Sequence, residues 1–455
     1  MTKSNLLEGN IKKQLISLAL PLLMGNILQQ LYNTIDAIIV GHYLGTSAFA
    51  ALGIAGTIMN LFIFILNGFC VGICTIFAQL YGSGDIKTFR NEVFISICIG
   101  VFITIFMSIL SILFLPYLLK ITHTPQELMT DINSYLKIII AGLFSTYLYN
   151  LFSCILRAIG NTKSSLYFLF LAVVCNVILD IIFIAYFHIG VSGAAFATVA
   201  SQFFAFIGCL FYFHKYNKNL FCKKEDFYFY KPLLYKTIRF GSATALQESS
   251  LYIGKILVQG NVNTLGTANI AAYTAAMRIE GFANSFGSSC SEALCIFISQ
   301  NFGANHSERI KQGFQKGMFL HISLGIVLSI LLYLLAPVCI TFFLGSAEKD
   351  ALFSGVAYMK CIALFYVLCF IGNAFVGYFR GISKITVPFI GTTLQITLRV
   401  IFSYLLLEKF GLAAVALATG IGWNTIVIYQ ITMFLKIKYQ KVLFRNKNYN
   451  SKCSI

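Results

Sequence analysis

Two aspartates stand in apolar stretches where a carboxylate is costly, and both have oxygen-bearing neighbours. Asp36 closes the segment QQLYNTID at 29–36, and Asp180 closes NVILD, which begins at Asn176. Residues four apart share one face of a helix, so the Asn176 amide and the Asp180 carboxyl point the same way. Carboxylate and amide oxygens bind small hard cations, and two neighbouring carboxyls can instead share a proton. Both kinds of chemistry are therefore predicted here.

The chain around these acids has the composition of an integral membrane protein. Of 455 residues, 58% are hydrophobic and 11% are charged, and the mean hydropathy is +0.81, whereas a soluble domain is about 25% charged. Apolar runs of about 20 residues recur, which suits membrane-spanning helices and exceeds the roughly ten-residue segments of a membrane barrel. The predicted fold class is all-α. We expect twelve transmembrane helices, at roughly 14–40, 48–80, 93–118, 135–158, 165–187, 191–213, 238–261, 269–300, 317–344, 354–379, 386–407 and 412–435.

The net charge of +17 follows membrane topology. Successive spans place every second connecting loop on the same side of the membrane, and most Lys and Arg lie in the loops of one side. The positive-inside rule therefore puts both termini in the cytoplasm. The first span is too long for a cleavable signal, and we expect a multi-pass protein of the cell membrane. The basic tail, 436–455, is predicted to lie on anionic lipid headgroups, and no nucleic-acid partner is expected. The 13 cysteines and six histidines have no metal-ligand spacing, so we expect no cofactor, and no metal apart from sodium at the acids.

The sequence contains an internal duplication. LGTSAFAA at 44–51 returns as LGTANIAA at 265–272, AQLYGSGD at 78–85 as SQNFGANH at 299–306, and GVSGAAFATVAS at 190–201 as GLAAVALATGIG at 411–422, while ILRAIGNTK at 155–163 has a weaker counterpart in YFRGISKIT at 378–386. Six spans per copy give both copies the same orientation, related by an axis along the membrane normal. The predicted domains are a lobe at 1–213, a cytoplasmic linker at 214–237, a second lobe at 238–435 and the tail. Secondary transporters commonly use this plan.

Five acids fall within the predicted spans. Facing lipid, they would together cost about 12–18 kcal/mol, comparable to the stability of a whole fold, so they must face protein or water. Helical rise places Asp36 about 8 Å, and Asp180 and Thr198 about 12 Å, from the outer membrane side. Matched depth predicts one site for a coupling ion, H⁺ or Na⁺, in the first lobe; interhelical hydrogen bonding is the structural alternative. The remaining acids are Glu248, Glu280 and Glu292.

The second lobe mixes acids with bases inside its spans. Glu248 and Lys255, seven apart, share a helix face, and the other members of this group are Arg278, Glu280, Glu292, Lys360 and Arg399. We expect structural ion pairs there, with ion or substrate contact as the alternative. In the first helix, Pro21 removes a backbone hydrogen bond and is predicted to kink the helix.

The motifs together resemble the multidrug and toxin extrusion (MATE) family over essentially the whole chain. The similarity is carried, in order, by LALP, DAIIVGHYLG, AQLYGSGD, RAIGNTK, NVILD, GVSGAAFATVASQ and ISQNFGA. The resemblance implies two six-helix lobes and a first-lobe cation or proton site, which by motif falls on Asp36, Asn176, Asp180 and Thr198. One branch of the family also pairs an acid on helix 7 with an acid on helix 10. Glu248 fits the first, but helix 10 here has Lys360 and no acid, which favours first-lobe coupling.

We therefore expect a secondary antiporter, monomeric and without enzymatic activity, that exports amphipathic organic cations by alternating access. Two other functions remain open. A lipid-linked oligosaccharide flippase of the same superfamily would use a cationic cavity, which the second-lobe bases could supply. A membrane prenyltransferase could use the Asn176 and Asp180 pair, but it would need further acids for magnesium and diphosphate, and no acid follows Asp180 before Glu225. A channel fits least, because no selectivity filter or ring of charges is readable.

Overall fold

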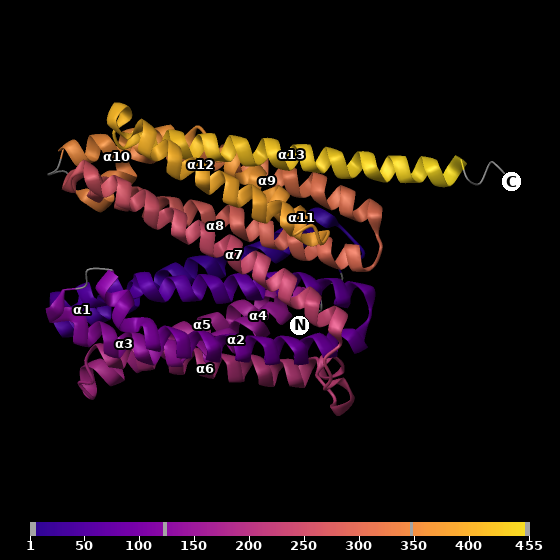
Figure 1. The fold of residues 1–455 in the computed structure, drawn as a ribbon, viewed down its shortest axis with the longest axis horizontal. Coiled ribbons are helices and arrows are strands. Elements are labelled where there is room, and N and C mark those ends of the chain that lie inside the picture. Colours follow the sequence, from indigo (N-terminus) through magenta and orange to yellow (C-terminus); the bar gives the residue numbers. More distant parts are fainter. Residues whose placement is uncertain (1–5, 122–124, 346–348, 451–455) are drawn as a thin grey trace. The chain divides into compact units, whose positions relative to one another are not determined.

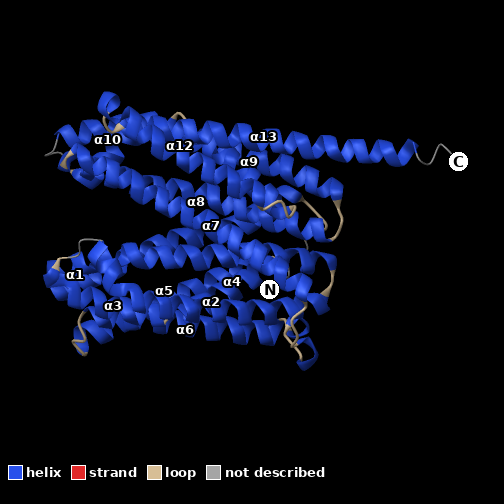
Figure 2. Cartoon of the chain, in the orientation of Figure 1, coloured by secondary structure: helices blue, strands red, loops and turns tan. Residues whose placement is uncertain are grey.

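A computed structural model describes residues 6–121, 125–345 and 349–450, and within these ranges the chain is helical and without strands (Figures 1 and 2). Four single turns of 3₁₀ or π helix link or extend the longer helices at Gln126–Leu128, Ile181–Tyr186, Lys218–Leu220 and Lys224–Asp226, and a fifth lies at Asn263–Leu265. The helices are α1 Ile11–Ser83, α2 Ile86–Ile121, α3 Met129–Ala141, α4 Leu143–Ala158, α5 Thr162–Asp180, α6 Val191–Tyr216, α7 Lys231–Val262, α8 Thr267–Gly303, α9 Ser307–Leu344, α10 Lys349–Ala363, α11 Tyr366–Gly381, α12 Thr386–Phe410 and α13 Ala413–Asn450.

The first two predicted spans form one long helix, α1, with a break at Gly45. This residue has φ 85° and ψ −176°, values open to glycine but not to residues with a Cβ, and the helix resumes after it. Pro21 lies within the first half, where the backbone keeps helical angles. At the start of α1, Asn10 accepts a hydrogen bond from the Lys13 backbone N–H at 3.2 Å, which satisfies one of the free donors of the first turn.

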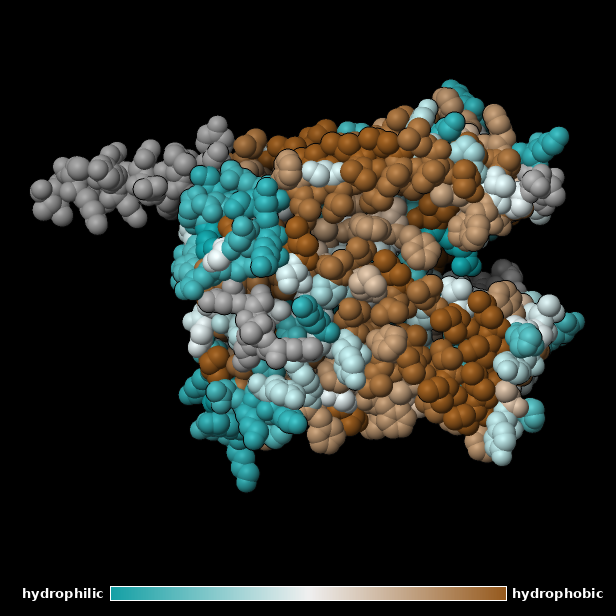
Figure 3. All heavy atoms as spheres, turned by 180° about the vertical axis from the view of Figure 1, so that it is seen from behind, coloured by the Kyte–Doolittle hydropathy of each residue, from teal (hydrophilic) through white to brown (hydrophobic). Residues whose placement is uncertain are grey.

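The helices have the length and surface of membrane spans. Within the described residues, seven are long and apolar enough to cross a bilayer, and α3 with α4 and α10 with α11 pass the same test as pairs bent by 46° and 50°. On the face drawn in Figure 3, hydrophobic side chains cover the middle of the helices and hydrophilic ones gather near their ends. Large apolar side chains are exposed on several of these helices, such as Phe102 at 70% on α2 and Phe342 at 82% on α9, as expected of helices that face lipid.

The chain divides into two compact units. Unit 1 comprises residues up to Ser249 together with Glu292–Phe314 and Gly381–Ser383, and unit 2 comprises Ser250–Ser291, Gln315–Arg380 and the residues from Lys384 onward. In unit 1, α1 packs along α3, α4 and α5, and α6 packs against α4 and α5. In unit 2, α12 packs along α13, and Tyr358, Tyr366 and Phe370 lie in a closed apolar core. Side chains of the basic tail from 438 onward lie outside the described residues, as do residues 451–455.

A reciprocal contact inside unit 1 joins the two copies of the repeat. The end of α1 crosses the end of α8 so closely that a Cβ on Gly82 would overlap the Gln300 carbonyl, and a Cβ on Gly303 would overlap the Gln79 carbonyl. Residues 79 and 300, and 82 and 303, are equivalent positions of the repeat. We call these four residues the glycine crossing. Its two glutamines act alike: Gln79 donates from Nε2 to the Gly381 carbonyl at 3.1 Å, and Gln300 to the Ala158 carbonyl at 2.7 Å.

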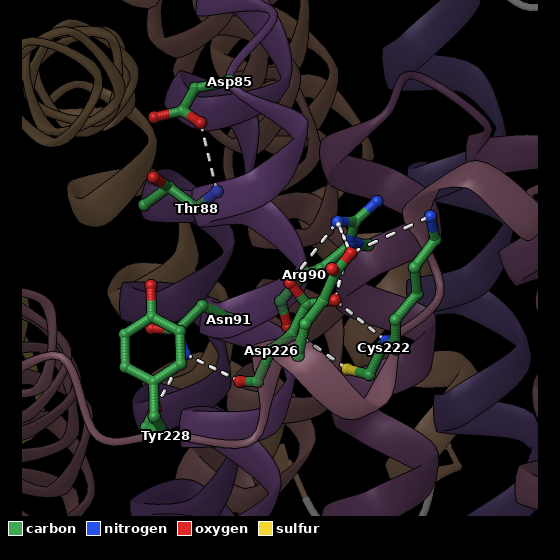
Figure 4. Close-up of polar contacts among 9 residues, drawn as sticks. Asp85, Thr88, Arg90, Asn91, Cys222, Asp226 and Tyr228 are labelled. Carbon is green, nitrogen blue, oxygen red and sulfur yellow. Dashed lines mark hydrogen bonds and ion pairs between the residues drawn. The ribbon is translucent and has the colours of Figure 1, made fainter.

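The segment between α6 and α7 is bound to the start of α2 (Figure 4). Arg90 donates from Nε to Asp226 Oδ2 at 2.7 Å, and Asn91 donates from Nδ2 to the carbonyls of Asp226 and Tyr228 at 2.9 and 2.7 Å. Asp226 is fully buried, and its Oδ2 also accepts from the Lys223 backbone N–H at 2.8 Å. The predicted linker is therefore an ordered strap along 218–230 that is fixed to unit 1. Burial, followed by the charge of Asp226, raises the pKa of the nearby Cys222 thiol to about 11.

Removing the buried charge of this strap should destabilise it. Asp226→Asn leaves the Arg90 guanidinium without its buried carboxylate, and breaking one side of a buried ion pair costs about 3–5 kcal/mol. We expect a lower melting temperature and faster alkylation of Cys222, measured by mass spectrometry. Glu225→Gln is the matched control, because Glu225 also contacts Arg90, at 3.3 Å, but is 64% exposed, and exposed pairs contribute about 0–1 kcal/mol. Equal effects of the two substitutions would contradict the assignment.

Candidate functional site

The two aspartates singled out by the sequence meet inside unit 1. Asp36 on α1 is 8% exposed and Asp180 at the end of α5 is fully buried, and their carboxyl groups are within hydrogen-bonding reach of each other. Among the described residues, no donor satisfies Asp36 Oδ1 or either oxygen of Asp180. Ionised carboxylates only accept hydrogen bonds. Two of them within hydrogen-bonding reach therefore repel each other unless a proton or a cation lies between them. The geometry suits the binding of a small positive ion.

Asn176 and Thr198 supply the neighbouring neutral oxygens. Asn176 is fully buried one turn before Asp180, and within the described part of the chain neither its amide oxygen nor its amide nitrogen has a partner. Thr198 on α6 is held by Tyr32 of α1, whose hydroxyl donates to Thr198 Oγ1 at 3.3 Å. A buried amide without a partner lowers the free energy of unfolding. The Asn176 side chain therefore costs stability in this position, and its amide is available to bind a ligand.

The local backbone and two tyrosines complete the surroundings of the acids. A π-helical turn, Ile181–Tyr186, begins directly after Asp180, and such wider turns occur frequently at functional sites. Tyr32 and Tyr135 both lie near the two carboxyls. The sequence analysis missed both tyrosines, although the position of Tyr32 four residues before Asp36 places it on the same helix face.

A cavity of about 340 Å³ in unit 1 opens beside this site. Its wall includes Asp36, Tyr32 and Thr198 at one end and Arg157 and Glu292 at the other, and seven Asn and Gln side chains line it. The volume falls in the range of small-molecule pockets, about 300–1,000 Å³. The wall is therefore much more polar than a packed membrane interior.

Glu292 joins unit 1, although its place in the sequence groups it with the second lobe. Its Oε1 lies 2.7 Å from Nη1 of Arg157, the last charged residue of α4. The pair is largely buried, with side chains 14% exposed for Arg157 and 21% for Glu292. Its basic partner comes from the first copy of the repeat, which the sequence analysis did not consider. Glu248 also lies in unit 1.

Unit 2 holds a separate group of charged and phenolic side chains. Tyr358 donates from its hydroxyl to Glu280 Oε1 at 2.7 Å, and Arg399 donates from Nη2 to the Tyr273 hydroxyl at 3.3 Å. Lys360 lies 5.5 Å from the ring centroid of Tyr333. Lys255 and Arg278 belong to the same unit. Tyr273, Glu280 and Tyr358 are buried in this unit, whereas Lys255 and Arg278 are exposed.

Metal-ligand clusters give no further candidate. Among the described residues, no group of three or more His, Cys, Asp or Glu side chains is placed to hold a metal ion. A small cation at the acid pair would therefore draw its ligands from the two carboxylates and from neutral oxygens such as those of Asn176 and Thr198.

A many-helix membrane protein with a buried acid pair beside a polar cavity has the layout of a secondary transporter. The MatE family model matches residues 21–182 and again residues 243–405. The chain therefore belongs to the MatE family of membrane transporters, as its motifs predict. The double match also confirms the internal duplication, since its two segments are spaced like the repeated motifs.

Curated relatives and solved structures agree with this placement. The chain is 28% identical over 369 residues to the "Probable multidrug resistance protein YpnP" of Bacillus subtilis, covering 81% of this chain and 82% of that protein. It is 25% identical over 453 residues to the "Probable multidrug resistance protein NorM" of Thermotoga maritima, covering 95% and 94%. A structure described as the outward-facing conformation of a multidrug resistance MATE family transporter has a TM-score of 0.88 at 22% identity, covering 96% of this chain and 98% of that one.

The fold prediction is confirmed by this likeness. The chain is an all-helical, multi-pass membrane protein whose structural neighbours have twelve transmembrane helices in two lobes. In the described ranges, twelve helical segments result when α1 is divided at Gly45 and the bent pairs α3 with α4 and α10 with α11 are each taken as one. The more polar α7 and α8 complete that number.

Proposed function

We propose that the protein is a cation-coupled antiporter that exports amphipathic organic cations. The observation that carries the proposal is the buried acid pair, in which Asp36 Oδ1 and both oxygens of Asp180 have no hydrogen-bond donor among the described residues. The curated relatives named as multidrug resistance proteins support export as the direction of transport and small organic compounds as the cargo. The aromatic and acidic groups around the cavity, such as Tyr32, Tyr135 and Asp36, suit a positively charged organic molecule.

The coupling ion acts by neutralising the pair. A proton or a sodium ion bound by Asp36 and Asp180 removes their repulsion, with Asn176 and Thr198 as further oxygen ligands. When the ion leaves, the two carboxylates repel each other, and α1 must move relative to α5 or admit water. Pro21 and Gly45 lie on α1 on either side of Asp36, so a change at the acid can shift the whole segment. Binding or release of the ion at Asp36 and Asp180 thereby changes the position of α1 at the substrate-binding region.

Two carboxylates allow more than one positive charge per cycle. One proton inward for one monovalent cation outward moves no net charge, whereas two ions inward make the exchange electrogenic. Each elementary charge that crosses 100 mV contributes about 2.3 kcal/mol. We propose electrogenic exchange with monocationic substrates, carried out by a monomer in the cell membrane with both termini in the cytoplasm. Its lobes are 1–213 and 238–435, and the tail at 436–455 lies on anionic lipid.

Transport by the purified protein in liposomes tests this function. We expect uptake of a fluorescent organic cation when a proton gradient or a sodium gradient is imposed alone, and a faster rate when a membrane potential is added. Asp36→Asn should lose the response to the gradient, because an amide cannot carry the exchanged charge. Glu127→Gln, an exposed acid of the same unit, is the control. Full coupling in Asp36→Asn would refute the site, and a rate that ignores potential would refute electrogenic exchange.

A further inference from the structure

The cavity beside the acids is long enough to lead away from them. Along α1 its wall extends from Pro21 to Asp36, and along α4 from Leu143 to Arg157. At 1.5 Å per residue, these stretches measure about 22 Å and about 21 Å, more than half of a roughly 30 Å hydrocarbon core. The cavity therefore connects the depth of the acid pair with the last turn of α4.

A row of polar side chains follows the cavity on one face of α1. Asn26, Gln29, Asn33 and Asp36 are spaced by three, four and three residues, and all four line the cavity. This spacing keeps them in one stripe of a helix. The cavity volume of about 340 Å³ is many times the roughly 10–15 Å³ that is needed to hold one water molecule. A stripe of amides suits a chain of water molecules, since each amide both donates and accepts hydrogen bonds.

Several polar atoms in the cavity wall require a partner that the described protein does not provide. They are Asp36 Oδ1, Gln202 Oε1 and Arg157 Nε, all buried without a hydrogen bond to described residues. They occur at both ends of the cavity as well as on α6 along its length. Buried polar groups of this kind are normally satisfied by water. The wall is thus built for hydration from one end to the other.

An ion pair closes the end of the cavity that is farthest from the acids. Arg157 and Glu292 form part of the wall there, with Nη1 and Oε1 2.7 Å apart. One turn away, the hydroxyl oxygens of Ser153 and Ser165 lie 2.6 Å apart across α4 and α5. The two long side chains, held together by their ion pair, therefore obstruct this end of the cavity.

We propose that this cavity is a water-filled path that begins at the acid pair, and that the Arg157–Glu292 ion pair is its gate. The path leads to the end of unit 1 whose connecting loops are rich in Lys and Arg, which we call the basic-loop side. The proposal rests on the proposed function, because it needs an ion at Asp36 and Asp180. The gate is linked to the glycine crossing: Gln300, eight residues after Glu292 on α8, binds the carbonyl of Ala158, the neighbour of Arg157. A separation of α8 from α4 breaks both contacts together. The ion then leaves toward the side that the positive-inside rule assigns to the cytoplasm.

Leakage of ions without substrate tests the gate. Liposomes that contain the wild-type protein should hold an imposed proton or sodium gradient, whereas Glu292→Gln should dissipate it at least about tenfold faster, as for a barrier lower by about 1.4 kcal/mol. The charge reversal R157E with E292R should restore tightness. Glu308→Gln, an exposed acid further along the same chain segment, is the control. A gradient-tight Glu292→Gln that melts like the wild type would overturn the proposal.

A second measurement separates this proposal from the proposed function. In Ser165→Cys, an impermeant thiol reagent added on the basic-loop side should react faster when Glu292→Gln is also present. Adding Asp36→Asn to Glu292→Gln should slow the leak if ions pass by way of the acids. An unchanged leak would place the path elsewhere and overturn the gate's connection to Asp36. In contrast, full gradient coupling in Asp36→Asn alone would refute the ion site. The water path would still be supported by the reaction of Ser165→Cys with the thiol reagent.

Discussion

Asp180→Asn should abolish ion-driven export while leaving the protein at least as stable as the wild type. The substitution removes one of the two charges that would bind the ion. Because breaking one side of a buried charge interaction costs about 3–5 kcal/mol, we expect the affinity for the ion to fall by about 100-fold or more. It also removes the repulsion between two buried carboxylates and gives Asp36 an amide donor. Export in liposomes measures the first effect, and thermal unfolding in detergent at alkaline pH without sodium measures the second.

The combination of lost transport and retained stability distinguishes an ion site from structural hydrogen bonding. If Asp180 and Asp36 held α5 to α1 by hydrogen bonds, Asp180→Asn would lower the melting temperature along with activity. Glu127→Gln, an exposed acid in unit 1, should leave both quantities unchanged. A variant that keeps gradient-driven export would exclude Asp180 from coupling.

Gly82→Ala and Gly303→Ala should each destabilise the protein, and by similar amounts. A single methyl group at either position overlaps a backbone carbonyl, of Gln300 or Gln79, and backbone cannot yield as a flexible side chain can. Overpacking of this kind costs about 1–3 kcal/mol, sometimes more. The melting temperature of the purified variants measures the effect. The double variant should cost less than the sum, because once the two helices have separated, the second methyl group meets no further clash.

Gly56→Ala is the matched control for these substitutions. Gly56 lies within the same helix α1, but nothing stands within 4 Å of a Cβ placed there. Alanine forms helix more readily than glycine by about 1 kcal/mol, so this variant should be neutral or stabilised. Equal destabilisation of Gly56→Ala and Gly82→Ala would mean that the crossing has no special packing.

Features that depend on distance along one helix could be predicted from the sequence. The depth of Asp36 and Asp180 follows from helical rise alone, and the structure brings them together. The duplication is visible in the sequence because similar motifs recur at a nearly constant spacing. The partnership of Asn176 with Asp180 on one helix face likewise follows from periodicity.

Contacts between helices far apart in sequence could not be predicted in the same way. Nothing in the period of α8 indicates that Glu292 meets Arg157, because that pairing depends on how the end of α8 packs in unit 1. The hydrogen bond from Tyr32 to Thr198 depends likewise on the rotation of α1 against α6. The strap at 218–230 reads as a polar linker, and only the burial of Asp226 reveals that it is fixed to α2.

The glycine crossing has the form of an isologous interface. In a symmetric dimer, residue i of one subunit contacts residue j of the other, and j contacts i in return. Here the glutamine and glycine of one repeat copy meet the glycine and glutamine of the other in that reciprocal manner. A half-length ancestor with a single Q-x-x-G motif would have gained both halves of this contact at once by pairing with itself. Fusion of two such copies would keep this contact in a single chain, and nothing in the contact requires the acids at 36 and 180 to be present in both copies.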